Sequence, residues 1–197
     1  EQLEIRDTIR DFVTREIKPV ALKADRLDQC DRTLLLDLLD QASQMGLRSL
    51  ALSEDRGGAG ADALTSCIAT EELAAGDPDI AAVLAESSRL AHVLFDQCMN
   101  DAQRESFLPK FLEGDRHHLA FAGREPGTDT RLGINYYRPA HTEIAVKTTA
   151  TKSGSDWIVN GMKDCVANAP VAGLFAVLVQ IAGRPHANVV LVPADAS

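Results

Sequence analysis

Positive charge is scarce in this sequence, and so are long apolar runs. Its 197 residues contain 20 Lys and Arg against 29 Asp and Glu, and the formal net charge at pH 7 is −9. No cluster of Lys or Arg stands out, which argues against a nucleic-acid-binding surface. No apolar stretch reaches the roughly 18 residues that a membrane-spanning helix needs. The composition, 45% hydrophobic and 25% charged, is that of a globular protein with a substantial core.

Cysteines are few and far apart. They form no C-x-x-C pair and lie at Cys30, Cys67, Cys98 and Cys165. A zinc site needs clustered ligands, so we expect no metal site. In a chain of this length, dispersed cysteines indicate reduced thiols in a reducing compartment. The sequence therefore predicts a cytoplasmic location.

The ends of the sequence predict a piece of a longer protein. The chain begins with Glu1 rather than Met, and it stops with "NVVLVPADAS", directly after an apolar segment typical of a strand. The first residues, "EQLEIRDTIRDF", lack the basic head and apolar core of a signal peptide. We therefore expect a longer polypeptide and no secretion signal in this part of it.

The first 115 residues predict helices. Apolar residues recur at helical spacing, at Ile5, Ile9, Phe12, Val13, Ile17 and Val20. Further helices are predicted over residues 32–46, 63–76, 77–99 and 101–115. Asp31 and Asp101 are candidate N-caps, and Gly46 and Gly76 are stop signals. Pro19 is expected to kink the first helix, whereas Pro78 occupies a first turn, where proline is favoured.

Short β-rich segments follow from about residue 117. They are separated by turn residues and cover residues 117–123, 143–154, 155–169, 174–181 and 187–194. The segment "TTATKSGSDWIVNG" predicts a hairpin. Helices followed by strands indicate a segregated α+β fold. We expect an N-terminal all-α helical bundle over residues 1–115. An antiparallel β-sheet or barrel domain is expected over residues 116–197, incomplete at its C-terminal end.

Two local motifs allow more than one interpretation. The loop "EDRGGAG" could cradle a phosphate, but it lacks the Lys-Ser/Thr of a P-loop, so a plain interhelix turn is favoured. The segment "HLAFAGREPGTD" predicts a strand that enters a Gly/Pro turn, whose free N–H groups can bind anions. His117 and His118 open this strand and would point to opposite faces, which is poor geometry for a shared metal.

The order of these segments resembles the acyl-CoA dehydrogenase family over nearly the whole chain. The family's G-L-x-x-x-x-x-x-E-x-x-G-G-x-G pattern is matched from Gly46 to Gly60, and its "EEL" occurs at residues 71–73. The family's T-E-P-x-x-G-S-D turn corresponds to "REPGTD", and its N-G-x-K-x-W/F-I-T/S-N hairpin end corresponds to "NGMKDCVAN". No single motif is decisive, but the ordered set is specific.

The resemblance implies a flavoprotein oxidoreductase of fatty acid metabolism. Family members bind FAD and oxidise the Cα–Cβ bond of an acyl-CoA thioester, while a Glu removes the α-proton. That Glu belongs to a C-terminal helical bundle, so no catalytic residue is assigned in this sequence. The resemblance further implies an acyl-CoA substrate, a homo- or hetero-tetramer and electron-transfer flavoprotein as the acceptor. A eukaryotic member would lie in the mitochondrial matrix rather than the cytoplasm.

The resemblance also implies which residues contact FAD, and several of them depart from the family pattern. The implied contacts are Phe121, Gly123, Arg124, Gly127, Thr128, Cys165 and Ala167, with Thr128 also meeting the substrate. Arg124 and Ala167 replace hydroxyl residues, Cys165 replaces an aromatic shield, and the turn is two residues shorter than usual. Together these changes could weaken flavin binding by about 10²-fold. FAD binding is therefore in question.

The departures leave a second function open. The chain could be a non-flavin member of the fold, either a structural or substrate-binding subunit of a hetero-oligomer or a redox-neutral acyl-CoA lyase. Candidates for contact with the phosphates of acyl-CoA are Arg131, Arg138 and Lys147. Tyr136 and Tyr137 lie in a long loop that could contact an unusual acyl group, although a surface insertion is favoured.

Overall fold

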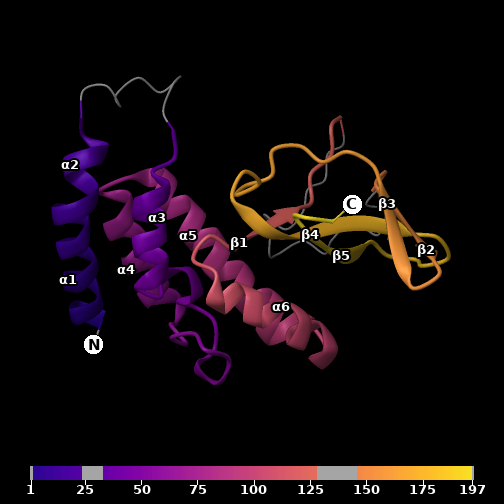
Figure 1. Cartoon of the computed structure of the whole chain (residues 1–197), viewed down its shortest axis with the longest axis horizontal. Coiled ribbons are helices and arrows are strands. Elements are labelled where there is room, and N and C mark those ends of the chain that lie inside the picture. The colour runs from indigo at the N-terminus through magenta and orange to yellow at the C-terminus, as the bar shows by residue number, and fades with distance from the viewer. Residues whose placement is uncertain (1, 24–32, 128–145, 197) are drawn as a thin grey trace. The chain divides into compact units, whose positions relative to one another are not determined.

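The computed structural model describes residues 2–23, 33–127 and 146–196. The chain divides into two compact units, Glu1–His118 and Leu119–Ser197. Helices make up the first unit, and the second contains the sheet (Figure 1). The predicted segregated α+β fold is therefore confirmed. The division of the structure falls a few residues after the boundary that the sequence predicts between residues 115 and 116.

The first helix continues through Pro19 with a change of helical type. Helix α1 (Gln2–Phe12) leads into the π-helical stretch η1 (Val13–Ile17) and then α2 (Lys18–Ala21). The N–H of Lys18 donates to the carbonyl of Val13, a wider turn than that of an α-helix. A proline ring clashes with the carbonyl four residues earlier in a regular α-helix, and the wider turn lies directly before Pro19. The predicted kink is thus a local widening.

Helix α3 (Leu36–Gln44) ends where its glycine predicts. Gly46 has φ 82°, the left-handed conformation that commonly terminates a helix, and a short turn η3 (Leu47–Ser49) follows. The predicted N-cap Asp31 lies outside the described residues. Arg48 in η3 is buried, its Nη1 donates to the carbonyl of His117 at 3.0 Å, and its guanidinium lies 4.2 Å from the centre of the Phe111 ring.

The glycine-rich loop after η4 (Glu54–Arg56) is an interhelix turn and no phosphate cradle. The N–H groups of Gly58 and Gly60 donate to the carbonyls of Ser53 and Leu52 at 3.1 and 2.8 Å. A Cβ on Gly58 would lie 2.1 Å from the Leu52 carbonyl oxygen, so only glycine fits there. The backbone donors that a phosphate would need are therefore used within the loop.

The next two helices are capped by aspartates. Asp62 accepts from the Thr65 N–H at the start of α4 (Ala63–Ala74), and Asp77 accepts from the N–H groups of Asp79 and Ile80 at the start of α5 (Pro78–Ala91). Pro78 sits in the first turn, as the sequence predicts. The π-helical stretch η5 (His92–Cys98) extends α5.

Helix α6 (Asp101–Glu113) corrects one predicted cap. Asn100, rather than Asp101, is the N-cap, because its side chain accepts from the Gln103 N–H at 2.9 Å and the Gln103 side chain accepts from the Asn100 N–H at 3.1 Å. This reciprocal pair is a capping box, and it satisfies two backbone donors at once. Within the described part of the chain, no helix is long and apolar enough to cross a membrane.

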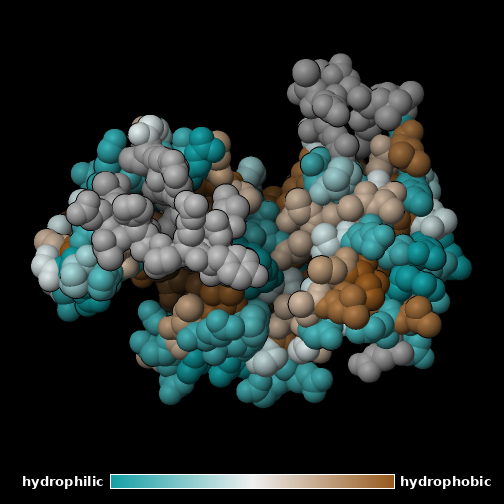
Figure 2. Space-filling view, turned by 180° about the vertical axis from the view of Figure 1, so that it is seen from behind, coloured by the Kyte–Doolittle hydropathy of each residue, from teal (hydrophilic) through white to brown (hydrophobic). Residues whose placement is uncertain are grey.

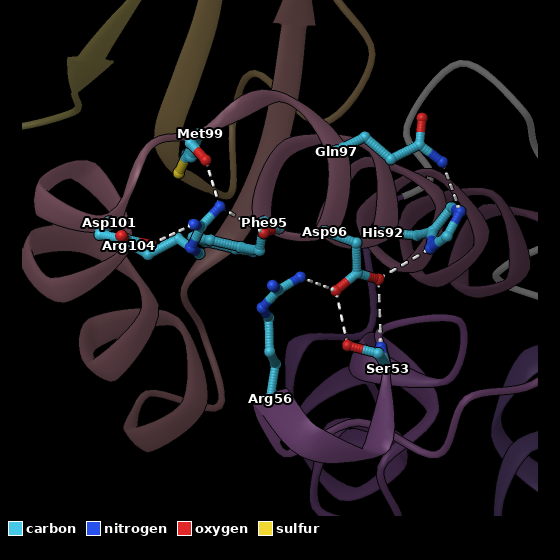
Figure 3. Close-up of polar contacts among 9 residues, drawn as sticks. All are labelled: Ser53, Arg56, His92, Phe95, Asp96, Gln97, Met99, Asp101 and Arg104. Atoms are coloured by element: carbon cyan, nitrogen blue, oxygen red, sulfur yellow. Dashed lines mark hydrogen bonds and ion pairs between the residues drawn. The ribbon is translucent and has the colours of Figure 1, made fainter.

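A polar network joins η4 and its N-cap residue to η5 in the helical unit (Figure 3). Asp96 accepts from the Ser53 hydroxyl at 2.6 Å and from Arg56 Nη1 at 2.8 Å, and its other oxygen lies 2.8 Å from His92 Nδ1. Burial raises the pKa of the Asp96 carboxyl, but these hydrogen bonds outweigh it and lower the pKa. Gln97 contacts the other ring nitrogen of His92 at 2.8 Å. These polar contacts hold residues 53–56 against η5.

The second unit is a five-stranded sheet of mixed direction. Its strands are β1 (His118–Ala122), β2 (Thr149–Ser153), β3 (Asp156–Asn160), β4 (Ala172–Ile181) and β5 (Asn188–Pro193). The order is β1-β4-β2-β3, with β5 also paired to β4. The β2–β3 and β4–β5 pairs are antiparallel, but β2 runs parallel to β4, with Thr149 opposite Gln180. The sheet is therefore mixed, whereas the sequence predicted a wholly antiparallel one.

The predicted hairpin is confirmed, and it forms one edge of the sheet. Ser153 pairs with Asp156 across the turn, and Gly154 has φ 63°. Every residue of β3 is exposed, including Trp157 and Ile158. Figure 2 shows hydrophobic residues in brown between hydrophilic residues in teal on the face that it draws. The core of the sheet instead lies along β1 and β4, where alternate residues of β4 are buried.

Candidate functional site

The candidate site begins at the end of β1. Leu119, Ala120 and Ala122 are buried, Phe121 is partly exposed, and the chain then enters the turn at Gly123, which is also buried. Gly127 at the far side of the turn is exposed and has φ 67°. Of the two predicted contacts, Phe121 is therefore partly accessible to solvent, whereas Gly123 is buried. The left-handed backbone conformation of Gly127 produces the turn that the sequence predicts here.

Glu125 anchors this turn, although the sequence analysis assigned it no role. The residue is 2% exposed. Its carboxylate accepts from the N–H groups of Lys147 and Thr148 at 2.7 Å each, and from the Thr148 hydroxyl at 2.5 Å. Burial raises the pKa of Glu125, but hydrogen bonds from Thr148, Lys147 and Lys163 outweigh it and lower the pKa to about 2. The carboxylate is therefore ionised at neutral pH and serves as a fixed acceptor.

The turn is joined to the end of the hairpin by contacts that we call the clamp. Lys163 Nζ lies 2.9 Å from a carboxylate oxygen of Glu125 and 3.4 Å from the carbonyl oxygen of Gly123. The N–H of Asp164 donates to the carbonyl of Arg124 at 3.2 Å. Lys163 and Glu125 are both buried, with side chains 9% and 2% exposed. The clamp is therefore a buried ion pair flanked by a backbone hydrogen bond.

The segment after the clamp has an unusual backbone. Cys165 and Asn168 have φ 48° and 64°, the left-handed region that non-glycine residues rarely adopt. Asn168 is buried, and its amide donates to the carbonyl of Leu119 at 3.1 Å, which ties the segment to β1. Such strained residues often occur at binding sites, where the surrounding structure maintains them. Cys165 and Ala167 are exposed between these two ties.

The side chain of Arg124 forms an ion pair with Asp164. Its Nε lies 3.2 Å from Oδ1 of Asp164, with side chains 63% and 33% exposed. That Asp164 oxygen is buried from solvent and has no hydrogen-bond partner within the described structure. The contact is therefore an ion pair without hydrogen-bond geometry, and the guanidinium is the cation that balances the buried oxygen.

The structure brings most of the predicted site residues into one region. Arg124 is joined to Asp164 in the clamp, and Cys165 and Ala167 follow directly along the chain. Thr128, Arg131, Tyr136, Tyr137 and Arg138 lie outside the described residues. Lys147 is exposed, and its N–H is used by Glu125. Three site residues lie in the motifs that carry the resemblance, but the sequence assigned them no role: Glu125, Lys163 and Asn168.

The two histidines that open β1 form no metal site. His118 is 1% exposed, and its Nδ1 lies 3.2 Å from the hydroxyl of Ser87. Burial, together with the nearby Arg48 cation, lowers the pKa of His118 to about 4, so its imidazole is neutral at pH 7. Among the residues that the structure describes, no group of three or more His, Cys, Asp or Glu could hold a metal ion.

Comparison with known proteins identifies the family of this chain. The family model for the acyl-CoA dehydrogenase N-terminal domain matches residues 1–115. The chain therefore belongs to the acyl-CoA dehydrogenase family.

Individual relatives share moderate identity with the chain. It is 25% identical over 178 residues to the mitochondrial short/branched chain specific acyl-CoA dehydrogenase of Bos taurus, covering 90% of this chain and 37% of the relative. It is 29% identical over 168 residues to the 3-(aryl)acrylate reductase of Clostridium sporogenes, covering 85% and 40%. The chain thus spans about two fifths of the length of these relatives.

Solved structures confirm the fold over the whole chain. A glutaryl-CoA dehydrogenase from Mycobacterium smegmatis has a TM-score of 0.77 at 28% identity, covering 99% of this chain and 46% of that one. A glutaryl-CoA dehydrogenase from the same organism in complex with FADH2 has a TM-score of 0.77 at 26% identity, covering 98% and 45%. The similarity thus extends from the helical unit into the sheet that carries the clamp.

Proposed function

We propose that this chain is part of a flavin-dependent acyl-CoA dehydrogenase-like oxidoreductase that acts on the Cα–Cβ bond of an acyl-CoA thioester. Membership of the family supports the general kind of function. The observation that carries the proposal is the clamp between residues 123–125 and 163–164, because it holds the two segments implied to contact flavin in fixed positions. The activity belongs to the whole protein, since the chain spans less than half of its relatives.

The described residues fit FAD as a backbone frame. Gly123 is buried, Gly127 turns the chain, and Asn168 ties residues 165–168 to β1. The frame does not depend on the side chains of Arg124, Cys165 or Ala167, because these are exposed. We infer that their exchange weakens flavin contacts without removing the site.

Each residue has a defined part in this proposal. Phe121, Gly123 and Gly127 would contact the cofactor together with Arg124, Cys165 and Ala167, and Thr128 would contact both cofactor and substrate. When bound, FAD supplies a hydride acceptor. The residues of this chain orient the cofactor and exclude water behind it, and the base that removes the α-proton lies outside this sequence.

The proposal extends to partners and location. A fatty-acid-derived or related acyl-CoA is the substrate class, and electron-transfer flavoprotein is the proposed acceptor. We further propose a tetrameric assembly and a cytoplasmic location, or the mitochondrial matrix in a eukaryote. The relatives support the substrate class, since two of them are named as an acyl-CoA and a glutaryl-CoA dehydrogenase.

The test is an absorption spectrum of the purified full-length polypeptide between about 300 and 550 nm, followed by identification of the cofactor released on denaturation. We expect flavin bands near one equivalent per chain. Absence of flavin, even after incubation with excess FAD, would instead favour a non-flavin member of the fold, either a subunit of a hetero-oligomer or a redox-neutral lyase. The exchanges at Arg124, Cys165 and Ala167 are what favours that second candidate.

A matched pair of variants locates the cofactor. Ala167→Thr restores the hydroxyl found in the family, and it should tighten FAD binding by about two- to tenfold, the value of one net hydrogen bond. Ala182→Thr is the control, because Ala182 is also an exposed alanine of the sheet unit but lies in the turn after β4. If both variants change the FAD dissociation constant equally, residue 167 is not at the cofactor.

A further inference from the structure

Arg124 poses an electrostatic problem for the proposed cofactor site. The position is implied to offer a neutral hydroxyl to the flavin ring, and a guanidinium there adds a full positive charge. Arginine stays protonated at any pH at which the protein works. Adding two electrons and one proton to oxidised FAD gives the anionic reduced form, so an uncompensated cation would stabilise the reduced cofactor over the oxidised one.

The structure contains a compensating charge beside this guanidinium. Asp164 Oδ1 lies 3.2 Å from Arg124 Nε. The backbone reinforces the pairing, because the N–H of Asp164 donates to the carbonyl of Arg124. Since Oδ1 is buried without a hydrogen-bond donor among the described residues, it depends on the guanidinium for charge balance.

The two charged side chains of the clamp are paired with each other. Lys163 lies 2.9 Å from Glu125, and both side chains are nearly fully buried. The ion pair of the clamp and the adjacent Arg124–Asp164 pair together carry no net charge. The Lys163–Glu125 pair is shielded from solvent, whereas the Arg124–Asp164 pair is partly exposed, with side chains 63% and 33% exposed.

We propose that Asp164 is a positioning residue that offsets the charge of Arg124 and so allows an arginine at a flavin-contacting position without shifting the cofactor toward its reduced form. This inference rests on the proposed function. It assigns Asp164 a task that the flavin-contacting residues themselves do not perform. It also predicts that the two residues act as a unit, so that either one alone is harmful and the loss of both is tolerated.

The experiment measures the ratio of the affinities for reduced and oxidised FAD in the full-length protein. The ratio comes from the two-electron reduction potential of the bound cofactor, with dithionite as the source of electrons. Asp164→Asn should raise the ratio about tenfold, because it leaves Arg124 uncompensated while the backbone bond remains. Arg124→Gln should lower it about tenfold. A unit charge acting over about 10 Å at an effective dielectric constant of about 20 has an effect of this order.

The double variant is the decisive one. Arg124→Gln with Asp164→Asn removes both charges, and the ratio should return to within about twofold of the original protein. A tenfold change corresponds to about 30 mV for a two-electron couple, so the three results are well separated. Arg184→Gln is the control, since Arg184 is an exposed arginine of the same unit, in the turn between β4 and β5.

Each possible result either supports the proposed role of Asp164 or overturns it. Single variants that shift the ratio in opposite directions, with a restored double variant, support the compensating pair. Equal ratios in all variants, or a double variant as far from the original as a single one, overturn it. If free coenzyme A rather than FAD loses affinity in Arg124→Gln, the guanidinium serves the substrate and the inference is wrong. If the original protein binds no flavin at all, the proposed function itself fails.

Discussion

The carboxylate of Glu125 offers the sharpest test of how the sheet unit is held together. Replacing it by glutamine keeps the shape of the side chain and one oxygen acceptor, but turns the other acceptor into a donor. That donor would face an N–H of residue 147 or 148, or the ammonium of Lys163, all of which now donate to Glu125. Lys163, whose side chain is 9% exposed, would also lose its counter-ion.

The expected loss is large for a conservative change. Removing one partner of a buried ion pair costs about 3–5 kcal/mol, because the other charge stays buried. The pKa gives an independent value: a carboxyl whose pKa falls from 4.5 to about 2 on folding contributes about 3 kcal/mol at neutral pH. The two values agree, so Glu125→Gln should lower the free energy of unfolding by about 3–5 kcal/mol at pH 7.

The direction of the pKa shift of Glu125 determines how its contribution to stability changes with pH. Because the pKa is lower in the folded protein, the contribution of Glu125 is fully present above pH 4.5 and is lost as the pH falls toward 2. The difference in stability between the original protein and Glu125→Gln should therefore shrink over this interval. Above pH 5 the difference should be constant.

The assay is urea unfolding followed by the fluorescence of Trp157, the single tryptophan of the sequence, which lies in the same compact unit as Glu125. Glu105→Gln is the control, because Glu105 is exposed on α6. Should Glu125→Gln prove too unstable to measure, Thr148→Val removes one hydrogen-bond donor and should cost about 1.5–3 kcal/mol. A loss no greater than that of the control, or a difference that does not change below pH 4.5, refutes the reasoning.

Two further predictions concern the helical unit. His118 has its pKa lowered to about 4 from 6.5, so its contribution is present above pH 6.5 and is lost as the pH falls through 4. His118→Gln should remove this part of the pH dependence in urea unfolding followed by circular dichroism, and an unchanged profile between pH 6.5 and 4 would contradict it. Asp96→Ala leaves Ser53, Arg56 and His92 without a common acceptor and should cost about 1–3 kcal/mol. The exposed pair Arg89–Glu86 is its control, and Arg89→Gln should cost no more than about 1 kcal/mol.

The helices and strands could be predicted from the sequence because their signals are local. Helical spacing, the turn proline Pro78 and the stop at Gly46 act within a few residues of the structure that they determine. The choice of Asn100 over Asp101 as a cap was also readable, since Gln103 completes the N-cap pattern with Asn100 and not with its neighbour. Asp101 fits the residue preference of an N-cap, but only Asn100 has a glutamine three residues later.

The clamp could not be predicted in the same way, because it joins residues far apart along the chain. Glu125 meets Thr148 and Lys163, and nothing near Glu125 in the sequence indicates that its carboxylate is buried. The parallel pairing of β2 with β4 has the same origin, since the paired residues Thr149 and Gln180 are far apart along the chain. Only the resemblance to a family brought these segments together, and it drew attention to the contacting side chains rather than to those that fix them.

This distinction bears on how the exchanged residues should be judged. Arg124, Cys165 and Ala167 are exposed, whereas Glu125 and Asn168, which fix their backbone, are buried and hydrogen-bonded. A change at an exposed contact alters the affinity for a ligand by the value of one interaction. A change at a buried anchor displaces every contact that the turn presents. Because the anchors are intact, we propose that the exchanges modify the cofactor site rather than remove it, and that the charge pair of Arg124 and Asp164 accommodates one of them.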